Sequence, residues 1–310
     1  MKILITGGAG FIGSNLARIL TQEHRFDVTV LDDFFTGSES FLSGLKVKII
    51  RASILEEKIL KKHVKNKDII FHLAARNIIA SSKNPIDDMN TNVRGTYNVL
   101  KIGLDENVKK VVYSSTSSIY GNPKHLPINE DETPSFLNFY SVSKYAGEGY
   151  AKTFYGQHDL PVSIVRYSNV YGVNQSPQNP YCGVIGKFIK SAIKNEPIVV
   201  HGDGDQSRDF TYIEDACKAT IMAGLNTKSD GEVFNIGTGV ETSINTLART
   251  IIELTNSKSV ISNIDKRDID NIRRRVLNIE KIRYKLKFFP STTLTKGLQQ
   301  TIEWQKKICE

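Results

Sequence analysis

The chain has 310 residues, of which 40% are hydrophobic and 24% are charged, and its mean hydropathy is −0.26. These values are typical of a water-soluble protein with a sizeable core, in one large domain or in one large domain and a smaller one. No apolar run approaches the roughly 18–20 residues of a membrane span. The net charge of +8 is scattered apart from the run Arg273–Arg275, which argues against a nucleic-acid surface and favours a basic pocket for a diphosphate.

Short apolar runs alternate with helical patterns through the first half of the chain. Strands are expected at Lys2–Thr6, Asp27–Asp32, Lys46–Arg51, Asp68–Ala74, Lys109–Ser115 and Val162–Tyr167. Helices are expected between them, for example at Ile12–Gln22, Thr91–Glu106 and Tyr140–Gln157. Since the strand runs are not polar at alternate positions, they suit strands that are buried on both faces. The alternation predicts an α/β fold with a doubly wound parallel sheet of the Rossmann type.

A glycine-rich loop follows the first predicted strand. It reads Gly7-Gly8-Ala9-Gly10-Phe11-Ile12-Gly13, and a helix is expected to begin there. Gly7 permits a tight turn, Gly10 lets the backbone approach a pyrophosphate, and Gly13 lets the helix pack closely on the strand. The helix N-terminus offers amide donors and a partial positive charge to phosphates. The loop therefore predicts a dinucleotide site.

Asp32 and Asp33 stand at the end of the second predicted strand, where the adenosine ribose of a dinucleotide would lie. A carboxylate there accepts hydrogen bonds from the ribose hydroxyls and repels a 2′-phosphate. The two residues predict NAD rather than NADP as the cofactor. The alternative is a turn with a structural role alone.

A hydroxyl-rich segment, Ser114–Ser118, ends the fifth predicted strand at the sheet edge where open α/β folds bind their ligands. Thr116 is the candidate for a hydroxyl that hydrogen-bonds a reacting sugar oxygen. For Ser117 and Ser118, self-capping of a serine-rich loop is the alternative.

Tyr140 and Lys144 stand four residues apart on a predicted helix, so their side chains share one face. A free tyrosine has a pKa of about 10 and is a poor base at neutral pH. We expect the Lys144 ammonium, together with a positively charged nicotinamide ring, to lower the pKa of Tyr140. Such a tyrosine can take the proton of a sugar hydroxyl while a hydride passes to the nicotinamide.

The pattern changes after about residue 170. Residues from Gly172 to Pro180 are rich in Asn, Pro and Gly and indicate a loop. A helix is expected at Val184–Lys194 and a strand at Pro197–His201, before a Gly-Asp-Gly-Asp turn. We see no internal repeat, so the second half predicts a smaller lobe with some elements that return to the main sheet.

Three cysteines, Cys182, Cys217 and Cys309, lie far apart and match no metal-ligand spacing. They predict free thiols in a reducing compartment and no metal site. Because the first strand begins beside Met1, we expect no signal peptide and a cytoplasmic location.

Taken together, these motifs resemble the extended short-chain dehydrogenases/reductases of the NAD-dependent epimerase/dehydratase family and, within it, the UDP-glucose 4-epimerases. The matching segments run almost end to end in family order: Thr6–Gly13, Phe71–Ala75, Asn92–Thr96, Ser114–Gly121, Tyr140–Lys144, Arg166–Gly172, Gly202–Asp209 and Phe234–Gly239. The resemblance implies an NAD-binding Rossmann domain at 1–170 and a nucleotide-sugar-binding lobe at 171–310. It also implies a homodimer with a four-helix interface formed by the helices around Thr91–Glu106 and Tyr140–Gln157.

The resemblance implies roles for single residues. Tyr140 would be the base, Lys144 would bind the nicotinamide ribose, and Thr116 would be the assisting hydroxyl. Contacts with NAD are implied for Gly7, Gly10, Phe11, Ile12, Gly13, Asp32, Asp33, Ser53, Ile54, Leu73, Ala74, Ala75, Asn92, Ser114, Tyr140, Lys144 and Tyr167. Contacts with the nucleotide sugar are implied for Thr116, Asn169, Gly183, Val184, His201, Arg208 and Arg267.

Four positions depart from the family pattern. Ser53 stands where an aspartate often binds adenine, and Arg76 stands where a glutamine or histidine is common, so that its role is open. Arg267 is the candidate for a second phosphate-binding arginine in a segment that has lost the usual Arg-x-Gly-Asp pattern. Arg275 falls at the position that gates sugar size and is a long, charged occupant.

Ser117 and Ser118 replace the carboxyl groups that the 4,6-dehydratases and the uronic acid decarboxylases of this family carry after the strand-end hydroxyl. One base, one hydroxyl and one bound hydride carrier suffice to oxidise C4 and return the hydride to the other face. We therefore expect a UDP-hexose 4-epimerase (glucose/galactose, or N-acetylated or uronic forms) with tightly held NAD. The alternatives are an NAD(P)-dependent keto-sugar reductase or an epimerase at another carbon, and a non-catalytic dinucleotide sensor.

Overall fold

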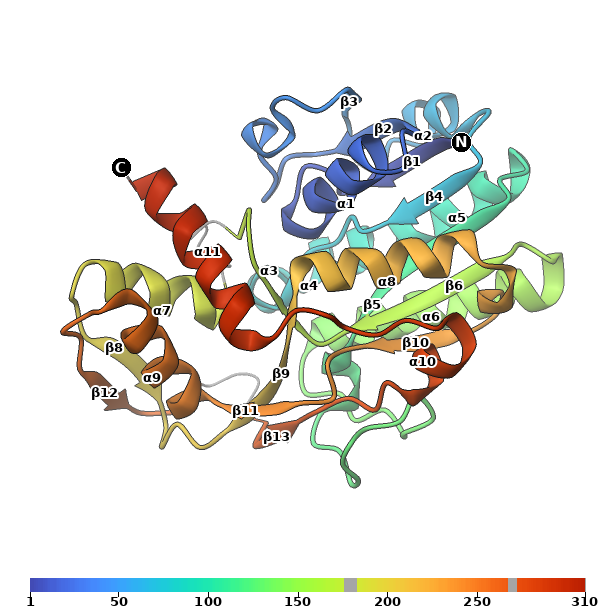
Figure 1. The fold of residues 1–310 in the computed structure, drawn as a ribbon. Helices are drawn as coiled ribbons and strands as arrows, with labels where there is room; N and C mark the ends of the chain where they lie inside the picture. Colours follow the sequence, from blue (N-terminus) through green and yellow to red (C-terminus); the bar gives the residue numbers. More distant parts are fainter. Residues whose placement is uncertain (176–182, 267–271, 310) are drawn as a thin grey trace.

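The computed structural model describes residues 1–175, 183–266 and 272–309. A parallel seven-stranded sheet lies at its centre, with the order β10–β6–β5–β4–β1–β2–β3 (Figure 1). The strands are β1 (Lys2–Thr6), β2 (Asp27–Asp32), β3 (Val47–Arg51), β4 (Ile69–His72), β5 (Lys110–Thr116), β6 (Val162–Tyr167) and β10 (Val233–Ile236). Because the chain winds outward from β1 in both directions, the prediction of a doubly wound parallel sheet is confirmed.

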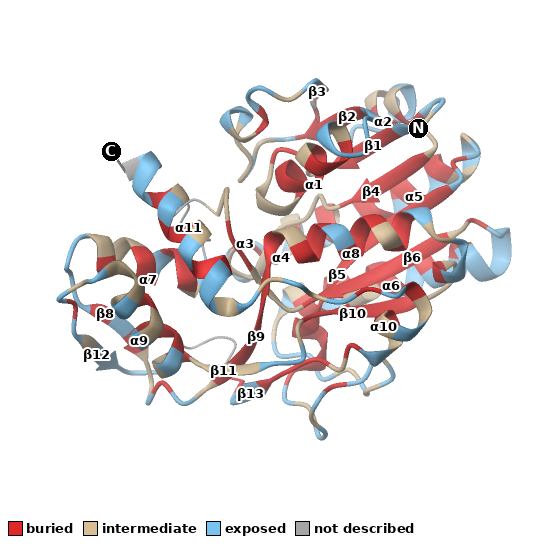
Figure 2. Cartoon of the chain, in the orientation of Figure 1, coloured by how far each residue is buried: buried red, intermediate tan, exposed pale blue. Residues whose placement is uncertain are grey.

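Helices cover both faces of this sheet (Figure 1). α1 (Phe11–Gln22) and α8 (Ile213–Leu225) pack together on one face, and α2 (Glu57–Val64), α5 (Gly95–Asp105) and α6 (Phe139–His158) pack on the other. Neighbouring residues of a strand point to opposite faces, so Ile3 and Ile5 belong to the core under α1 whereas Leu4 belongs to the core under α5. The strands are accordingly buried along most of their length (Figure 2).

β3 departs from the expectation that the strands are buried on both faces. It forms the edge of the sheet and pairs with β2 alone, and its Lys48, Ile49 and Arg51 are exposed. The charged residues at two of these positions are typical of an edge strand that must not pair with another chain.

The helix expected at Thr91–Glu106 consists of two different segments. Met89–Arg94 forms a π-helical segment, η2, and α5 continues it from Gly95. Such π-helical segments often accompany functional sites, because they add a residue that turns neighbouring side chains to new directions. The other expected helices, including α7 (Val184–Ile193), lie within two residues of their predicted ends.

The second half of the chain forms a smaller group of elements beside the main sheet and also supplies β10 and α8 to that sheet. Its strands are β7 (Asn169–Tyr171), β8 (Ile198–His201), β9 (Ser207–Tyr212), β11 (Glu241–Ser243), β12 (Ile261–Ile264) and β13 (Arg274–Arg275), and its further helices are α9 (Ile244–Thr255), α10 (Glu280–Leu286) and α11 (Leu294–Cys309). β9 lies between β11 and β13 and also pairs with β7, while β8 pairs with β12. Among the described residues, no helix is long and apolar enough to cross a bilayer.

The remaining elements are short connections. They are η1 (Glu39–Leu42), α3 (Ile78–Lys83), α4 (Pro85–Asp88), η3 (Ser117–Tyr120) and η4 (Thr227–Ser229). Cys217 on α8 is a free, buried thiol whose Sγ lies 3.8 Å from the carbonyl oxygen of Ile12, and burial raises its pKa. Cys182 and the side chain of Cys309 lie outside the described residues.

Candidate active site

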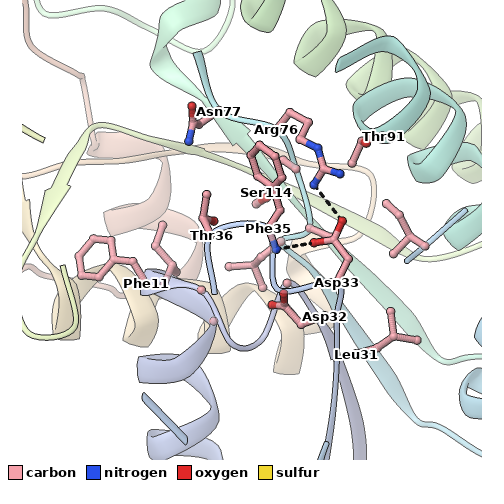
Figure 3. A pocket seen from close by; sticks show the side chains of 18 of the residues that line it. Phe11, Leu31, Asp32, Asp33, Phe35, Thr36, Arg76, Asn77, Thr91 and Ser114 are labelled. Atoms are coloured by element: carbon pink, nitrogen blue, oxygen red, sulfur yellow. Dashed lines mark hydrogen bonds and ion pairs between the residues drawn. The ribbon is translucent and has the colours of Figure 1, made fainter. Parts of the chain in front are cut away.

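A cavity of about 250 Å³ opens at the carboxyl ends of the central strands, at the edge where open parallel sheets bind ligands. It is lined by every residue expected to contact the cofactor except Asn92: Gly7, Gly10, Phe11, Ile12, Gly13, Asp32, Asp33, Ser53, Ile54, Leu73, Ala74, Ala75, Ser114, Tyr140, Lys144 and Tyr167. Figure 3 shows part of this wall, with the β2 loop facing the β4 loop. The fold thus brings together residues from seven segments of the sequence.

The glycine loop has the geometry of a phosphate cradle. Gly7 has a positive φ of 70°, and a Cβ atom there would lie 2.6 Å from the backbone nitrogen of Ala74. A Cβ atom at Gly13 would lie 2.2 Å from the carbonyl oxygen of Gly7. Both positions therefore exclude any other residue, and the resulting close packing directs the N-terminus of α1 into the cavity. Amide donors at a helix N-terminus suit the diphosphate of a dinucleotide.

Asp32, the last residue of β2, and Asp33 accept hydrogen bonds from the backbone of the neighbouring loops. Asp32 is buried, and its carboxylate accepts hydrogen bonds from the backbone nitrogens of Ala9 (2.8 Å) and Phe34 (2.7 Å). Burial raises the pKa of Asp32, while these two bonds oppose the increase. Asp33 accepts from the backbone nitrogen of Phe35 and forms an ion pair with Arg76. Each carboxylate oxygen can accept more than one hydrogen bond, so both residues keep acceptor capacity for a ribose.

Tyr140 and Thr116 meet at the end of β5. Asn138 caps α6 by accepting a hydrogen bond from the Ser141 nitrogen, which places Tyr140 in the first turn of the helix. There the Thr116 side chain acts on the Tyr140 hydroxyl and favours its ionised form. The Thr116 Oγ1 also accepts from the backbone nitrogen of Ser118 at 3.1 Å. The self-capping that was considered for the serines is thus performed by Thr116, beside its contact with Tyr140.

The pKa of Tyr140 was expected to be lowered by Lys144 together with a positively charged nicotinamide ring, and the residues of the chain by themselves do not lower it. Burial raises the pKa of Tyr140 to about 12 and outweighs the opposing effect of Thr116. Lys144 is itself buried, with its Nζ 4.3 Å from the centre of the Tyr113 ring. Burial lowers the pKa of Lys144 to about 7, although the carboxylates of Glu148 and Asp88 oppose this. A lysine that is partly neutral at pH 7 cannot offset the burial of the phenolate.

A buried ion pair lies below these residues and was not predicted. Both carboxylate oxygens of Glu148 accept from Arg166, at 2.9 and 2.6 Å, and Glu148 also accepts from Ser115, which lines the cavity. Arg166 donates further to Tyr120. The available signal was Glu148 one turn after Lys144, since a glutamate on the inner face of a helix needs a cation as partner.

Asn92 does not line the cavity. It is buried, and its side chain bonds both backbone groups of Arg76 as well as Ser143 and Asp88. It therefore connects the loop after β4 to the helix of Tyr140 and Lys144. The match to the Asn-x-x-Gly-Thr motif marked the residue, but its partners are distant in sequence.

Apart from Thr116 on β5, the described residues that were expected to contact the nucleotide sugar come from the second half and do not line the cofactor cavity. Asn169 begins β7, Gly183 caps α7 ahead of Val184, and His201 ends β8. Arg208 on β9 is 9% exposed, so it is not a solvated surface arginine, and its Nη1 donates to the carbonyl oxygens of Ser207 and Ile272. Arg275 on β13 is buried and is the register partner of Arg208. Arg267 lies outside the described residues.

Comparison with known proteins adds a family match and close relatives. The model of the NAD dependent epimerase/dehydratase family matches residues 3–237. A protein of Methanocaldococcus jannaschii that is provisionally named UDP-glucose 4-epimerase is 37% identical over 98% of both chains. The UDP-N-acetyl-alpha-D-glucosaminuronate decarboxylase of Bacillus cytotoxicus is 36% identical over 99% of this chain and 98% of its own.

Among solved structures, the UDP-glucose 4-epimerase of Thermotoga maritima with UDP-glucose superimposes with a TM-score of 0.95. Its sequence is 33% identical, and the match covers 100% of both chains. The similarity thus extends over both halves of the molecule.

Proposed function

This chain belongs to the NAD-dependent epimerase/dehydratase family, and we propose that it inverts the C4 centre of a UDP-hexose. The hexose is glucose/galactose, or their N-acetylated or uronic forms. It is an NAD-dependent enzyme, as its relatives are. Since a 4-epimerase returns to C4 the hydride that it removes, its NAD is regenerated in every cycle and is best held throughout.

One observation carries this proposal: Thr116 and Tyr140 come together at the end of β5, where Thr116 favours the phenolate, and the two residues after Thr116 are serines. Dehydration and decarboxylation by relatives use a carboxyl group at this point of the chain. Ser117 and Ser118 have no carboxyl group to offer. What the pair can do is remove and return one proton, which is what an epimerisation through a C4 ketone requires.

In the proposed reaction, Tyr140 Oη takes the proton of the C4 hydroxyl, and the Thr116 hydroxyl donates a hydrogen bond to the phenolate. When bound, oxidised NAD accepts and returns a hydride and adds a positive charge, which lowers the pKa of a neighbouring phenol. Tyr140 then gives the proton back from the same oxygen once the keto-sugar has turned its other face. Lys144 and the glycine loop hold the cofactor.

We assign the cofactor to residues 1–170 and the nucleotide sugar to residues 171–310. Arg208 supports this division because a buried guanidinium suits the diphosphate charge of the substrate. Asn169, Gly183, Val184 and His201 belong to the same half, and we assign them to the nucleotide or diphosphate.

We also propose a homodimer through α5 and α6. Several large apolar side chains on η2, α5 and α6 are exposed in the single chain: Met89 (53%), Tyr97 (41%), Phe139 (58%), Val142 (49%) and Tyr150 (41%). Contiguous apolar exposure of this kind is typical of a surface that another protein covers. A second copy with the same helices would complete a four-helix interface.

The proposed function is tested by incubating the purified protein with UDP-glucose and with UDP-galactose, without added cofactor. Interconversion of the two sugars supports a 4-epimerase with retained NAD. Stoichiometric consumption of added NADH or NADPH indicates the keto-sugar reductase instead. If a panel of nucleotide sugars, including N-acetylated and uronic forms, gives no product, the proposal of an epimerase is wrong.

A further inference from the structure

Arg76, which follows β4 and the Ala74-Ala75 pair, contacts two carboxylates and an aromatic ring. Its Nη1 lies 2.9 Å from Asp33 Oδ2 and its Nε lies 2.6 Å from Asp87 Oδ2. Its guanidinium carbon lies 4.1 Å from the centre of the Phe35 ring. The side chain is only 13% exposed, so that water shields these contacts incompletely. We call Arg76, Asp33 and Asp87 the Arg76 bridge; Figure 3 shows its contact between Arg76 and Asp33.

The Arg76–Asp33 contact joins the two loops on either side of the glycine loop. In the sheet, β1 lies between β2 and β4. Asp33 follows β2 and Arg76 follows β4, so a contact between them spans the loop that follows β1. All three loops line the same cavity. A dinucleotide that rests its diphosphate on the N-terminus of α1 would therefore share the cavity with the Arg76–Asp33 contact.

The backbone of Arg76 is fixed while its side-chain partners are more exposed. Asn92 accepts a hydrogen bond from the Arg76 nitrogen at 2.7 Å and donates one to the Arg76 carbonyl oxygen at 3.0 Å. On the other side, the side chain of Asp33 is 30% exposed and that of Asp87 is 35% exposed. The contact can thus open at the side chains without movement of the β4 loop.

Within the bridge, the Arg76 guanidinium is the group that suits an anionic ligand, because its two partners are carboxylates. Among the described residues that line the cavity, the lysines and arginines are Lys144 and Arg76. Lys144 lies on α6 beside Tyr140, so Arg76 is the basic side chain of the β2–β4 side. A guanidinium there can stay paired with its carboxylates and still attract a diphosphate, because it carries five N–H donors.

We propose that the Arg76 bridge closes over the cofactor and retains it: Arg76 must separate from Asp33 before NAD enters or leaves. The inference rests on the proposed function in one respect, because retention matters to an enzyme that regenerates its NAD. The closure itself is a property of the cofactor cavity, and its test does not depend on turnover.

The test measures the rate at which NAD leaves the purified holoprotein, by rapid dilution into a trap dehydrogenase that reports free NAD. Arg76→Met keeps the length of the side chain and removes its charge, and we expect release at least about tenfold faster, since loss of about 1.4 kcal/mol from the bound state changes a rate tenfold. Arg76→Lys keeps the charge but not the two-pronged geometry and should fall between the two. Raised salt should accelerate release from the native protein and much less from Arg76→Met.

Asp87→Asn tests the bridge more specifically, because Asp87 pairs with Arg76 but does not line the cavity, so that its effect on NAD must pass through Arg76. It should also accelerate release, and the double variant with Arg76→Met should release NAD no faster than Arg76→Met alone. Arg283→Met is the matched control: Arg283 also pairs with a carboxylate, Glu280, and lies over a ring, that of Phe289, but away from the cavity. It should leave the release rate unchanged.

Two results would overturn the closure. The first is release from Arg76→Met and Asp87→Asn within twofold of the native rate, with the fold intact by circular dichroism. The second is a selective loss of NADP affinity with unchanged NAD release, which would make Arg76 a 2′-phosphate ligand. If the protein retains NAD through the bridge but converts no sugar, the closure stands and the proposed epimerase fails.

Discussion

At the residue scale, burial keeps the phenol of Tyr140 protonated, and a protonated phenol cannot accept a proton as a base. Burial raises its pKa to about 12, so the phenol keeps its proton at neutral pH. Thr116 favours the phenolate, but one neutral hydroxyl does not offset burial. If Tyr140 is the base that we propose, its reactivity depends on positive charge that a bound ligand brings to the cavity.

Tyr140→Phe removes the proton acceptor and leaves the ring in place. We expect NAD binding and the fold to persist while turnover falls by about 10²- to 10⁴-fold, the usual contribution of general acid–base catalysis. Initial rates of UDP-sugar interconversion and cofactor content measured on the same preparation check this. Tyr145→Phe on the same helix serves as control and should keep its activity; a Tyr140→Phe enzyme at near-native rate would remove Tyr140 from the mechanism.

His72 makes stability depend on pH. It is fully buried between Thr6 Oγ1 (2.7 Å) and Thr96 Oγ1 (3.0 Å), and burial lowers its pKa from 6.5 to about 3. Between about pH 6.5 and pH 3, the His72 imidazole is protonated in the unfolded chain but neutral in the folded chain. The free energy of unfolding therefore decreases as the pH drops towards 3. At pH 4.5 we expect His72 to account for a loss of about 2.5 kcal/mol.

Urea unfolding at pH 7 and at pH 4.5 measures this loss. His72→Gln should show a smaller decrease in the free energy of unfolding between the two pH values than the native chain. His125→Gln, at a histidine whose side chain is 81% exposed, should follow the native curve. Equal decreases in all three proteins would mean that His72 does not titrate as its burial indicates.

The residues that could be predicted are those whose role follows from local sequence. The glycine loop, Asp32, Asp33, Tyr140 and Lys144 each belong to a short pattern with its own chemistry, and the structure gathers them around one cavity. Glu148 and Asp88 could not be assigned, and Asn92 was assigned to the cofactor and not to Arg76, because their partners are supplied by tertiary packing. Burial, which raises the pKa of Tyr140 in the chain by itself, was missed because helical spacing says nothing about it.

At the element scale, the position of α6 on β5 decides where Tyr140 lies. Gly147 allows this contact: a Cβ atom there would lie 2.1 Å from the hydroxyl oxygen of Tyr113. Tyr113 is fully buried, and its hydroxyl donates to the carbonyl oxygen of Lys144 at 3.0 Å. The backbone at Lys144 is thus held against the sheet by the hydrogen bond from Tyr113 and by the close approach that Gly147 allows.

Gly147→Ala should push α6 away from β5. We expect a loss of about 1–3 kcal/mol in the free energy of unfolding, the usual cost of overpacking a core, and a lower turnover. Gly156→Ala on the same helix is the matched control, since a Cβ atom there meets nothing within 4 Å. That change should be neutral or should stabilise the protein by up to about 1 kcal/mol. Similar unfolding curves for both variants would contradict the role given to Gly147.

Element types were predictable where hydrophobic runs are long and end in glycine or polar residues. β1, β2 and β6 have the bounds that the sequence predicts, whereas β4 ends two residues earlier than expected. The exposure of β3 was missed, because an edge position follows from strand order and not from composition. The π-helical turn of η2 was missed because it preserves an almost helical apolar spacing.

At the scale of the whole molecule, the apolar face of α5 and α6 predicts a dimer. Light scattering at micromolar concentration should give twice the chain mass. Tyr150→Glu places a charge in that face and should shift the population to monomers, because an unpaired carboxylate is costly to bury. Tyr284→Glu, at a tyrosine that is 79% exposed on α10, should leave the mass unchanged. A native chain with the mass of one copy would refute the dimer.

The division of labour between the halves was only partly legible from the sequence. The change of composition near residue 170 marks the second lobe, and the family motifs beyond it pointed to Arg208. Strand order was not legible, since β10 joins β6 across more than 60 residues of chain. That pairing depends on long-range packing, which no local pattern records.

The buried thiol of Cys217 allows the rate of local opening between α1 and α8 to be measured. Its thiol lies against the carbonyl oxygen of Ile12 in the first turn of α1, and burial keeps it protonated and shielded from reagents. In a chain whose Cys182 and Cys309 are serines, a maleimide can reach it only during openings of this region, so that the labelling rate counts those openings. A nucleotide held by the glycine loop should make the openings rarer in proportion to its saturation. The labelling rate of Cys217 therefore reports how much of the protein holds a nucleotide at the glycine loop.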